Sequence, residues 1–275
     1  MAAVMSGNKC PHLKIKNEDI GRYVILPEDP KCASKIAPFL DGVRQIAQNR
    51  EYNIYAGTLD GQKVNVCSTG KSGSSAAIAV EELIAGGAST FIRVGTGIGI
   101  YPLAAAGRLV IAEAAIRAEG TSCKYLPQGC LTIAHFAVTS ALAQAAKELS
   151  QPEDYRIGIV HSSDDLCGMV NSDDPAVEKN AKSLREGDLK YGCQAIETAC
   201  AAIYAVGLAH SVFPHKVRCG GVLTMLWDVG FPPYKITPED NLCAVKCAVR
   251  AMKLLIEQDK LAYNRSMDKM HGLIR

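Results

Sequence analysis

Several features that would direct this chain to a membrane, a nucleic acid or a secretory route are missing from its sequence. No stretch approaches the roughly 20 uninterrupted apolar residues that a membrane helix needs. Thirty basic residues against 28 acidic ones leave a net charge of +2, which is too small to predict a surface for nucleic acid or for an anionic membrane. Met1 to Cys10 lacks the apolar run of a secretory signal. We therefore expect a cytoplasmic protein that binds neither nucleic acid nor a membrane.

A metal-binding pattern is missing as well, although eleven cysteines are present. The sequence contains no Cys-x-x-Cys and no histidine pair at the spacing of a zinc site. Several cysteines lie in apolar runs, such as Val66-Cys67 and Ala199-Cys200-Ala201, where cysteine behaves as a small core residue. We therefore interpret the cysteines as free thiols in a reducing compartment and expect no metal.

Short β-rich runs alternate with helical segments along the 275 residues, and glycine or proline marks the joints. The expected strands are Tyr23–Leu26, Lys63–Ser68, Thr90–Val94, Leu109–Ala112, Arg156–His161 and Val217–Leu226. The expected helices are Ala33–Ala47, Ser74–Ala85, Ala134–Leu149, Ala176–Leu184, Gln194–Ala209 and Pro238–Asp259, with a solvated loop at Cys167–Asp174. This alternation predicts one α/β domain over residues 1–275, with a mostly parallel sheet covered on both faces. Ligands of such sheets bind just after the carboxyl ends of strands.

A turn rich in hydroxyl groups and glycine follows one of these strands. It reads Ser68-Thr69-Gly70-Lys71-Ser72-Gly73-Ser74 and leads into an expected helix. Its backbone amides, with Lys71 and the helix N-terminus, have the chemistry to hold an anion. The turn does not meet the Gly-x-x-x-x-Gly-Lys-Ser/Thr pattern of a P-loop. The alternative is a tight strand–helix connection capped by Ser74.

Arg93 begins a second glycine-rich segment, Arg93-Val94-Gly95-Thr96-Gly97-Ile98-Gly99. A guanidinium beside glycines and a hydroxyl suits phosphate, because arginine binds phosphate oxygens bidentately. The run also meets part of a dinucleotide fingerprint, but the acidic residue expected about 20 positions later is matched only loosely by Glu113. A phosphate site is therefore the favoured interpretation and a dinucleotide fold the less favoured one.

Glu197 is an acid within an otherwise small and apolar run, Ala195-Ile196-Glu197-Thr198-Ala199, which we expect to be helical. If this carboxylate is buried it needs hydrogen-bond donors, such as the two hydroxyls of a ribose. On an exposed face it would be solvated and inert. The run alone leaves both interpretations open.

Taken together and in this order, the segments resemble the hexameric nucleoside phosphorylases and lean towards the uridine phosphorylase branch. The resemblance covers the chain from Pro11 to about Lys253. Its best-matching stretches are Pro11-His12-Leu13, Asn49-Arg50-Glu51-Tyr52, Val66-Cys67-Ser68-Thr69-Gly70, Ala79-Val80-Glu81-Glu82-Leu83, Phe91-Ile92-Arg93-Val94-Gly95-Thr96 and Val160 to Asp164. The resemblance implies a single-domain, three-layer αβα fold with a twisted, mixed and partly closed sheet.

The resemblance also implies a reaction. Phosphate attacks the anomeric carbon of a nucleoside and releases free base and ribose 1-phosphate, a step of pyrimidine salvage. Arg93 and Thr96 are expected to bind phosphate, which Arg50 reaches from a neighbouring subunit. Glu197 is expected to hold the ribose hydroxyls, and His12 of that same neighbour the 5′-hydroxyl. The assembly is then a homodimer or a hexamer of dimers, and phosphate is a co-substrate with no metal or organic cofactor.

This chain departs from the family at its first phosphate loop. The family pattern Pro-Gly-Asp-Pro-x-Arg is replaced by Pro27-Glu28-Asp29-Pro30-Lys31-Cys32. Glu28 puts a carboxylate where glycine lets phosphate approach the backbone, and Cys32 removes a bidentate cation. Lys31 and Lys71 offer partial compensation, since a point charge does not reproduce a guanidinium fork.

The segments for sugar and base depart too. The family's Glu-Met-Glu is Ala195-Ile196-Glu197 here, so one of two acids remains. Gly168-Met169-Val170-Asn171-Ser172 has neither the Gln nor the Arg that the uridine enzymes use for the pyrimidine. Leu166 lies near the position of an aromatic over the base, and Asp228 matches an acid of the purine branch.

Three functions follow from a good scaffold with a partial site. The first is a uridine-type nucleoside phosphorylase, still active or with a changed base preference. The second is a phosphorylase-like protein without turnover, retained for nucleoside binding or assembly. The third is a related nucleoside hydrolase, in which water replaces phosphate. Dependence on free phosphate separates them, because function resides in the site and not in the fold.

Overall fold

The structure is a computed structural model that describes most of the chain. It covers residues 9–101, 103–166, 168, 174–211, 216–228 and 238–272, with side chains left out at 227–228, 238–241 and 265–272. The strands are β1 (Tyr23–Pro27), β2 (Asp41–Asn49), β3 (Tyr52–Leu59), β4 (Gln62–Cys67), β5 (Thr90–Gly99), β6 (Leu109–Ala118), β7 (Thr132–Ile133), β8 (Tyr155–Ser163), β9 (Ala195–Glu197) and β10 (Arg218–Asp228). The α-helices are α1 (Pro30–Ile36), α2 (Gly73–Ala85), α3 (Phe136–Leu149), α5 (Pro175–Lys190), α6 (Cys200–Ala209) and α7 (Pro238–Gly272).

The strands form one mixed sheet that closes partly on itself. Its order is β10-β6-β8-β9-β5-β1-β4-β3-β2, and β10 also pairs with β5. The strands β5, β10, β6, β8 and β9 therefore make a ring, while β1, β4, β3 and β2 extend from it. The twisted, mixed and partly closed sheet that the resemblance implies is confirmed. The mostly parallel sheet expected from the alternation of strands and helices is wrong, because among the described strands as many pairs are antiparallel as parallel.

Strand β5 is the strand at which the ring and the extension meet. Along one edge it pairs with β10 in parallel from Thr90 to Gly99. Along the other edge β1 pairs with it only as far as Val94, and β9 takes over at Ile98. The stretch between these two partners, Gly95–Gly97, is where the sheet changes neighbours. Such a switch point is a favoured binding position in α/β sheets.

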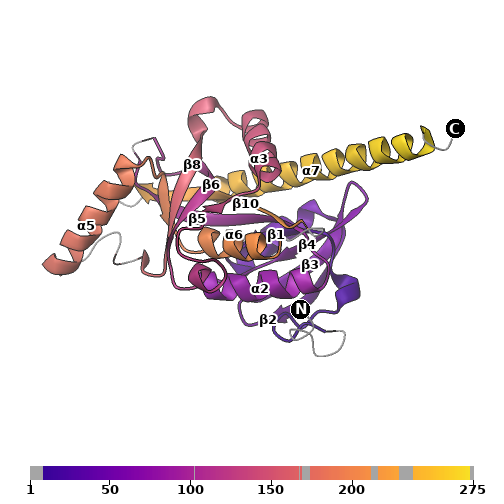
Figure 1. Cartoon of the computed structure of the whole chain (residues 1–275), viewed down its shortest axis with the longest axis horizontal. Helices are drawn as coiled ribbons and strands as arrows, with labels where there is room; N and C mark the ends of the chain where they lie inside the picture. Colours follow the sequence, from indigo (N-terminus) through magenta and orange to yellow (C-terminus); the bar gives the residue numbers. More distant parts are fainter. Residues whose placement is uncertain are drawn as a thin grey trace.

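Helices cover both faces of the sheet, as Figure 1 shows. Helices α2 and α6 pack together on one face, where they bury apolar side chains such as Val80, Leu83 and Ile203. Helices α3 and α7 pack on the other face, with Leu142 and Leu255 in a second apolar cluster. The three-layer αβα arrangement is confirmed, and it leaves the strand ends as the place for a site.

Two expected helices are wrong in part. Ala33–Ala47 is α-helical only to Ile36 and continues as a 3₁₀ helix from Ala37 to Phe39, and β2 then begins at Asp41. Gly42, the second residue of β2, has a φ of 58°, a conformation that does not continue a right-handed helix. Strand β3, which pairs with β2, was not expected either. The expected helix Gln194–Ala209 is instead the short strand β9 followed by helix α6. Glu197, which was expected to be helical, is the last residue of β9.

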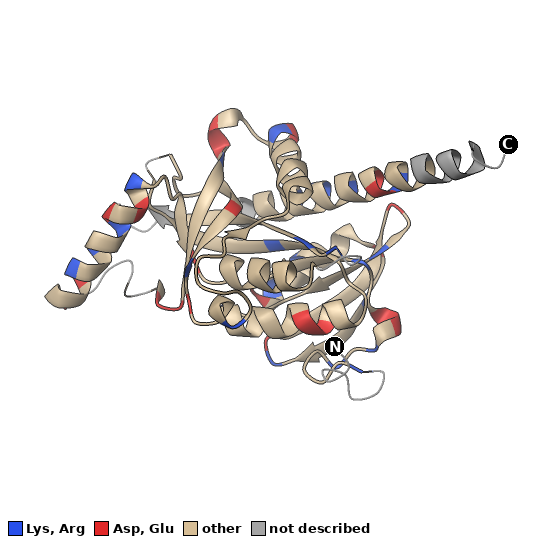
Figure 2. Ribbon diagram, in the orientation of Figure 1, with Lys and Arg blue, Asp and Glu red and all other residues tan. Residues whose placement is uncertain are grey.

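The balance of charges, the lack of a membrane-spanning helix and the state of the cysteines were each predicted from the sequence. Figure 2 shows basic and acidic residues interspersed along the ribbon, with both signs on α5 and α7. In the described part of the chain, no helix has the length and apolarity to cross a membrane. Free thiols are confirmed at Cys10, Cys32, Cys67, Cys123, Cys130, Cys193, Cys200, Cys219 and Cys247. Burial raises the pKa of the Cys67 and Cys219 thiols, which keeps these core thiols protonated near neutral pH.

Candidate active site

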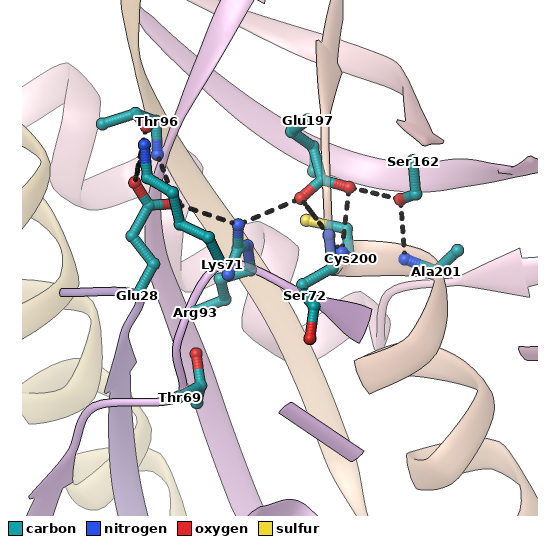
Figure 3. Close-up of polar contacts among 12 residues, drawn as sticks. Glu28, Thr69, Lys71, Ser72, Arg93, Thr96, Ser162, Glu197, Cys200 and Ala201 are labelled. Carbon is teal, nitrogen blue, oxygen red and sulfur yellow. Dashed lines mark hydrogen bonds and ion pairs between the residues drawn. The ribbon is translucent and has the colours of Figure 1, made fainter. Parts of the chain in front are cut away.

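Arg93 is a fully buried cation held between two carboxylates (Figure 3). Its Nη2 atom lies 3.1 Å from Glu197 Oε2 and 3.3 Å from Glu28 Oε2. Burial acts to lower the pKa of the guanidinium, but the charges of Glu197 and Glu28 outweigh it and hold this pKa above its ordinary value. The Nε and Nη1 atoms are buried with no hydrogen-bond partner among the described residues. Arg93 is therefore a permanent cation with donors beyond those that the two carboxylates use.

The glycines after Arg93 make room for its side chain. A Cβ atom at Gly95 would lie 2.9 Å from Arg93 Nη2 and 3.0 Å from its Cζ. Such distances are too short for any side chain at position 95 without moving the guanidinium. Arg93 and Thr96 lie within β5, which continues to Gly99, and so the expectation that the site begins after the strand is wrong here. The segment around Arg93 is instead the switch point of the sheet.

Glu28 directs its carboxylate into the group of residues that the sequence assigned to phosphate. Its Oε1 accepts a hydrogen bond from Thr96 Oγ1 at 2.6 Å, and its Oε2 accepts one from Thr96 N at 3.4 Å. Lys71 Nζ lies 4.0 Å from Oε1. Only 7% of Glu28 is exposed. The residues that were expected to bind phosphate are thus assembled around a carboxylate of the protein itself.

The second carboxylate, Glu197, lies at the end of β9 and just before α6, in place of the helical position expected from the sequence. Its oxygens accept hydrogen bonds from Ala199 N at 2.8 Å and Cys200 N at 2.9 Å. Ser162 Oγ donates a further short hydrogen bond to it and accepts one from Ala201 N. Donors at a helix N-terminus and Arg93 together supply this buried carboxylate with hydrogen bonds and a countercharge.

Ser162 belongs to the candidate site, although no role was predicted for it from the sequence. It belongs to the Ser-Ser-Asp stretch at the end of β8, which was quoted only as a family match. Strand β8 runs parallel to β9 with Ser162 opposite Glu197. The pairing of β8 with β9 brings Ser162 next to Glu197. Neither segment on its own indicates that pairing, and so Ser162 was not predicted.

The turn 68–74 uses its amides mainly for the backbone. Thr69 N donates to Pro27 O and Gly70 N donates to Glu28 O. These bonds fix the end of β1 against the turn, so those two amides are not available for an anion. The helix is capped by Ser72, whose hydroxyl accepts from Ser75 N, and the expected cap at Ser74 is wrong. Lys71 is the one residue of this turn that directs charge at Glu28 within the described site.

A pocket of about 280 Å³ lies beside Glu28. Its lining includes Lys71, Thr96, Cys32 and Thr224. Cys32 is the residue that replaces the family's arginine, and burial together with the charge of Glu28 raises the pKa of its thiol to about 11. Cys32 is therefore neutral near neutral pH and gives the pocket no charge of either sign.

His12 and Arg50 lie apart from this cluster in the isolated chain and line no part of that pocket among the described residues. His12 Nδ1 is 2.6 Å from Glu82 Oε1, and His12 is half exposed. Glu82 is almost fully buried and also accepts from the backbone N–H groups of His12 and Leu13. Arg50 is exposed in the β2–β3 turn with a φ of 54°. Both side chains are thus open to a neighbouring molecule.

The residues expected near the base lie at or after the ends of strands β8 and β10, and only some of them lie within the described part of the chain. Leu166 is partly buried and follows the end of β8 at Ser163. Asp228 is the last residue of β10, opposite Gly99, and its side chain lies outside the described residues. Cys167 and residues 169–173, which include Val170 and Asn171, also lie outside them.

A second pocket of about 670 Å³ is larger but chemically unlike the first. It lies between the start of α3 and the end of α6, and it is lined mainly by apolar side chains such as Ile133, Phe136 and Leu208. Neither Arg93 nor its two carboxylates lines it. In the part of the chain that the structure describes, no group of three or more His, Cys, Asp and Glu side chains could hold a metal. The candidate site is therefore the Arg93 cluster.

Comparison with known proteins gives a consistent result. Residues 22–215 match the family described as the phosphorylase superfamily. A uridine phosphorylase of Treponema pallidum is 38% identical over 253 residues, which is 90% of this chain and 95% of that protein. A uridine phosphorylase of Thermococcus kodakarensis is 46% identical over 153 residues, 56% of this chain and 54% of its own length. A guanosine phosphorylase of Halorubrum lacusprofundi is 36% identical over 156 residues, 57% of this chain and 64% of its own length.

Proposed function

The chain belongs to the phosphorylase superfamily, and on that premise we propose that it is a uridine-type nucleoside phosphorylase. It cleaves the N-glycosidic bond of a nucleoside with inorganic phosphate and releases free base and ribose 1-phosphate. The observation that carries this proposal is the Arg93 cluster, in which one buried guanidinium contacts both Glu28 and Glu197. An anion subsite and a sugar subsite then share a single cation.

The chemistry requires positioning and electrostatic stabilisation more than a covalent nucleophile. Positive charge develops on the sugar as the bond to the base breaks, and phosphate at the Arg93 end then attacks the anomeric carbon. Glu197, a carboxylate held by the N-terminus of α6, accepts hydrogen bonds from the ribose hydroxyls and favours the cationic sugar. Arg93 fixes Glu197 and the phosphate relative to each other. The reaction needs no metal and no organic cofactor, and it belongs to pyrimidine salvage in the cytoplasm.

One observation favours a second candidate function. The carboxylate of Glu28 is hydrogen-bonded to Thr96 and paired with Arg93, and so it engages the donors that phosphate needs. A protein in which this arrangement never opens binds nucleoside without turnover, or uses water in place of phosphate. The phosphorylase remains the better-supported proposal, because the relative that matches 90% of this chain is a uridine phosphorylase.

The test is a panel of nucleosides incubated with and without phosphate, with free base and ribose 1-phosphate quantified. A phosphorylase releases base from uridine only when phosphate is present and forms ribose 1-phosphate in equal amount. Release of base without phosphate assigns the protein as a hydrolase. Binding of nucleoside with no release under either condition supports the protein without turnover.

We propose assembly as dimers, which the exposed positions of His12 and Arg50 support. Both are exposed in the single chain and carry the groups that the family resemblance assigns to a neighbour's site. We expect light scattering to give a homodimer or a hexamer of dimers at micromolar concentration. A protein that is monomeric there and still cleaves uridine would contradict the exchange of these two side chains between subunits.

Glu82 is expected to act as a positioning residue for His12. Its carboxylate fixes His12 Nδ1 at 2.6 Å, which leaves Nε2 to face the 5′-hydroxyl of a neighbour's ribose. Replacing Glu82 with glutamine should lower kcat/KM for uridine by about tenfold, the value of a charge-assisted hydrogen bond. Because 5′-deoxyuridine lacks that hydroxyl, its kcat/KM should change little.

The matched control for this change is Glu81→Gln on the same helix. Glu81 pairs with His210 instead of His12, and so this variant should treat the two substrates as the parent does. Steady-state kinetics with both substrates provides the measurement. If Glu82→Gln lowers kcat/KM equally for uridine and 5′-deoxyuridine, Glu82 has a structural role and does not position His12 for the 5′-hydroxyl.

A further inference from the structure

The donors around Glu28 are those that an oxyanion would require. Thr96 Oγ1 and Thr96 N lie 2.6 and 3.4 Å from its oxygens. Arg93 Nη2 lies 3.3 Å away and Lys71 Nζ 4.0 Å away. Figure 3 shows Thr96, Lys71 and Arg93 directed at this one carboxylate. An anion that binds to these donors must therefore come within contact distance of Glu28.

The backbone of Glu28 cannot move away to make room. Its N–H donates to Val94 O at 3.2 Å, and its carbonyl accepts from Gly70 N at 3.0 Å. The next residue, Asp29, caps α1 by accepting from Lys31 N. Only the side chain can turn, and the space beside it is the pocket of about 280 Å³. Glu28 thus remains beside any anion that enters this pocket.

We propose that Glu28 makes this subsite selective for an oxyanion that carries a proton, which is phosphate or arsenate and not sulfate. The proposal rests on the proposed function, because it takes inorganic phosphate as the co-substrate. Two bare anions at contact distance in a buried site repel each other strongly. A proton between them converts this repulsion into a hydrogen bond from a phosphate O–H to the Glu28 carboxylate. Sulfate has no proton to donate near neutral pH.

The proton balance follows directly. Near neutral pH much of the phosphate in solution is HPO₄²⁻. Because a dianion beside the Glu28 carboxylate is repelled more strongly than a monoanion, the site binds phosphate with one further proton, as H₂PO₄⁻. One of its two O–H groups donates to Glu28, the other faces the pocket, whose lining includes Asp29 and Thr224, and the two remaining oxygens face Arg93, Thr96 and Lys71. No bond to phosphorus forms or breaks in this binding step.

The charged and titratable groups around Glu28 are compatible with this assignment. Arg93 faces it from β5 and Lys71 from the turn before α2. From the α1 side, Asp29, Lys35 and Cys32 line the same pocket. The raised pKa of Cys32 keeps that thiol uncharged. Arg93, Lys71 and Lys35 thus accompany the carboxylates of Glu28, Glu197 and Asp29, so the group carries no excess negative charge, and a monoanion is repelled by Glu28 less than a dianion is.

Calorimetry on the full chain tests the proposal with phosphate and with sulfate as probes. The parent is expected to bind phosphate about tenfold or more tightly than sulfate, the value of one charge-assisted hydrogen bond. Glu28→Gln presents an amide that can donate to either anion, and so the preference should fall close to one. Glu186→Gln makes the same chemical change on an exposed face of α5 and should keep the parent's preference.

A second measurement gives a result on the parent that does not depend on the folding of a variant, and it is then repeated on Glu28→Gln. Titration with phosphate in two buffers of different ionisation enthalpy reports the protons taken up on binding. We expect net uptake for the parent at neutral pH and less uptake for Glu28→Gln, whose folding is checked by thermal melting.

The outcomes separate this inference from the proposed function. Equal affinity of the parent for phosphate and sulfate, no proton uptake, or no binding of either anion overturns the inference. An unchanged preference in a folded Glu28→Gln variant overturns it as well. Selective phosphate binding without phosphate-dependent release of base supports the inference and contradicts the phosphorylase. Phosphate-dependent release of base without selectivity does the reverse.

Discussion

Replacing Arg93 with alanine is expected to abolish phosphate-dependent cleavage and to lower the free energy of unfolding by about 3–5 kcal/mol. The substitution removes the partner of two buried carboxylates at once, because Arg93 Nη2 contacts both Glu28 and Glu197. Glu197 then loses the cation beside it in a buried position, and Glu28 keeps only the more distant Lys71 at 4.0 Å. Denaturant unfolding measures the stability, and calorimetry should show a loss of phosphate affinity of about 2–3 kcal/mol.

Two control variants separate charge from geometry. Arg93→Lys keeps the cation but loses the guanidinium fork, and it should retain part of the stability and little of the activity. Arg44→Ala removes an exposed arginine that is paired with Asp19, and it should cost no more than about 1 kcal/mol. If Arg93→Ala binds phosphate as the parent does, Arg93 is not the centre of the anion subsite.

The second large effect is expected from restoring the first phosphate loop. In the double variant Glu28→Gly, Cys32→Arg, phosphate affinity should rise by up to roughly 3–6 kcal/mol, the value of about two charged hydrogen bonds. Glu28→Gly releases Thr96 and Arg93 from the carboxylate. Cys32→Arg adds a cation to the same pocket. Calorimetry with phosphate, on the double variant and on both single variants, measures the effect.

The two substitutions should couple instead of adding. In the single variant Cys32→Arg, the new guanidinium faces Glu28 across the pocket and pairs with it, so phosphate gains little. Once Glu28 is also gone, the same guanidinium is available to phosphate, and the preference for phosphate over sulfate should disappear. Cys123→Arg, on an exposed 3₁₀ turn, is the control for added charge.

Cleavage of uridine by the double variant tests whether Glu28 and Cys32 weaken the phosphate site. Activity should stay modest, because Ala195 still replaces the second acid of the family's sugar loop. A parent that turns over uridine at ordinary rates, and a slower double variant, would contradict a weakened phosphate site. Glu28 and Cys32 would then belong to a working arrangement of different design.

Helices with a strong apolar periodicity could be predicted from the sequence. Contacts between residues of distant segments could not. Helices α2 and α3 were predicted within two residues, because apolar positions recur at helical spacing there. Arg93 and Thr96 were predicted as neighbours since one segment contains both. The salt bridge from Arg93 to Glu28 spans 65 residues, and no local pattern indicates which carboxylate a buried arginine will meet.

The wrong elements have a local cause as well. Ala33–Ala47 is rich in helix-forming residues, and so its helix propensity predicted a single helix over the whole range. The structure instead has a short helix, a 3₁₀ turn and the start of a strand there. Tertiary pairing of β2 with β3 decided the outcome instead. Ser162 and Glu197 are brought together by the register of β8 with β9, which a reading of separate segments does not contain.

The place of β5 in the ring also bears on how the chain reaches its native state during synthesis. Strand β1, one neighbour of β5, precedes it in the chain, whereas β9 and β10 follow it by about a hundred residues or more. Until residues 195–228 leave the ribosome, β5 keeps one edge and its last residues unpaired, and Arg93 has only Glu28 as a carboxylate partner. Unpaired strand edges favour association with other chains. We therefore expect a nascent chain that stalls after β8 to be the species most in need of a chaperone, and ring closure to be the late, slow step because its contacts are distant in sequence.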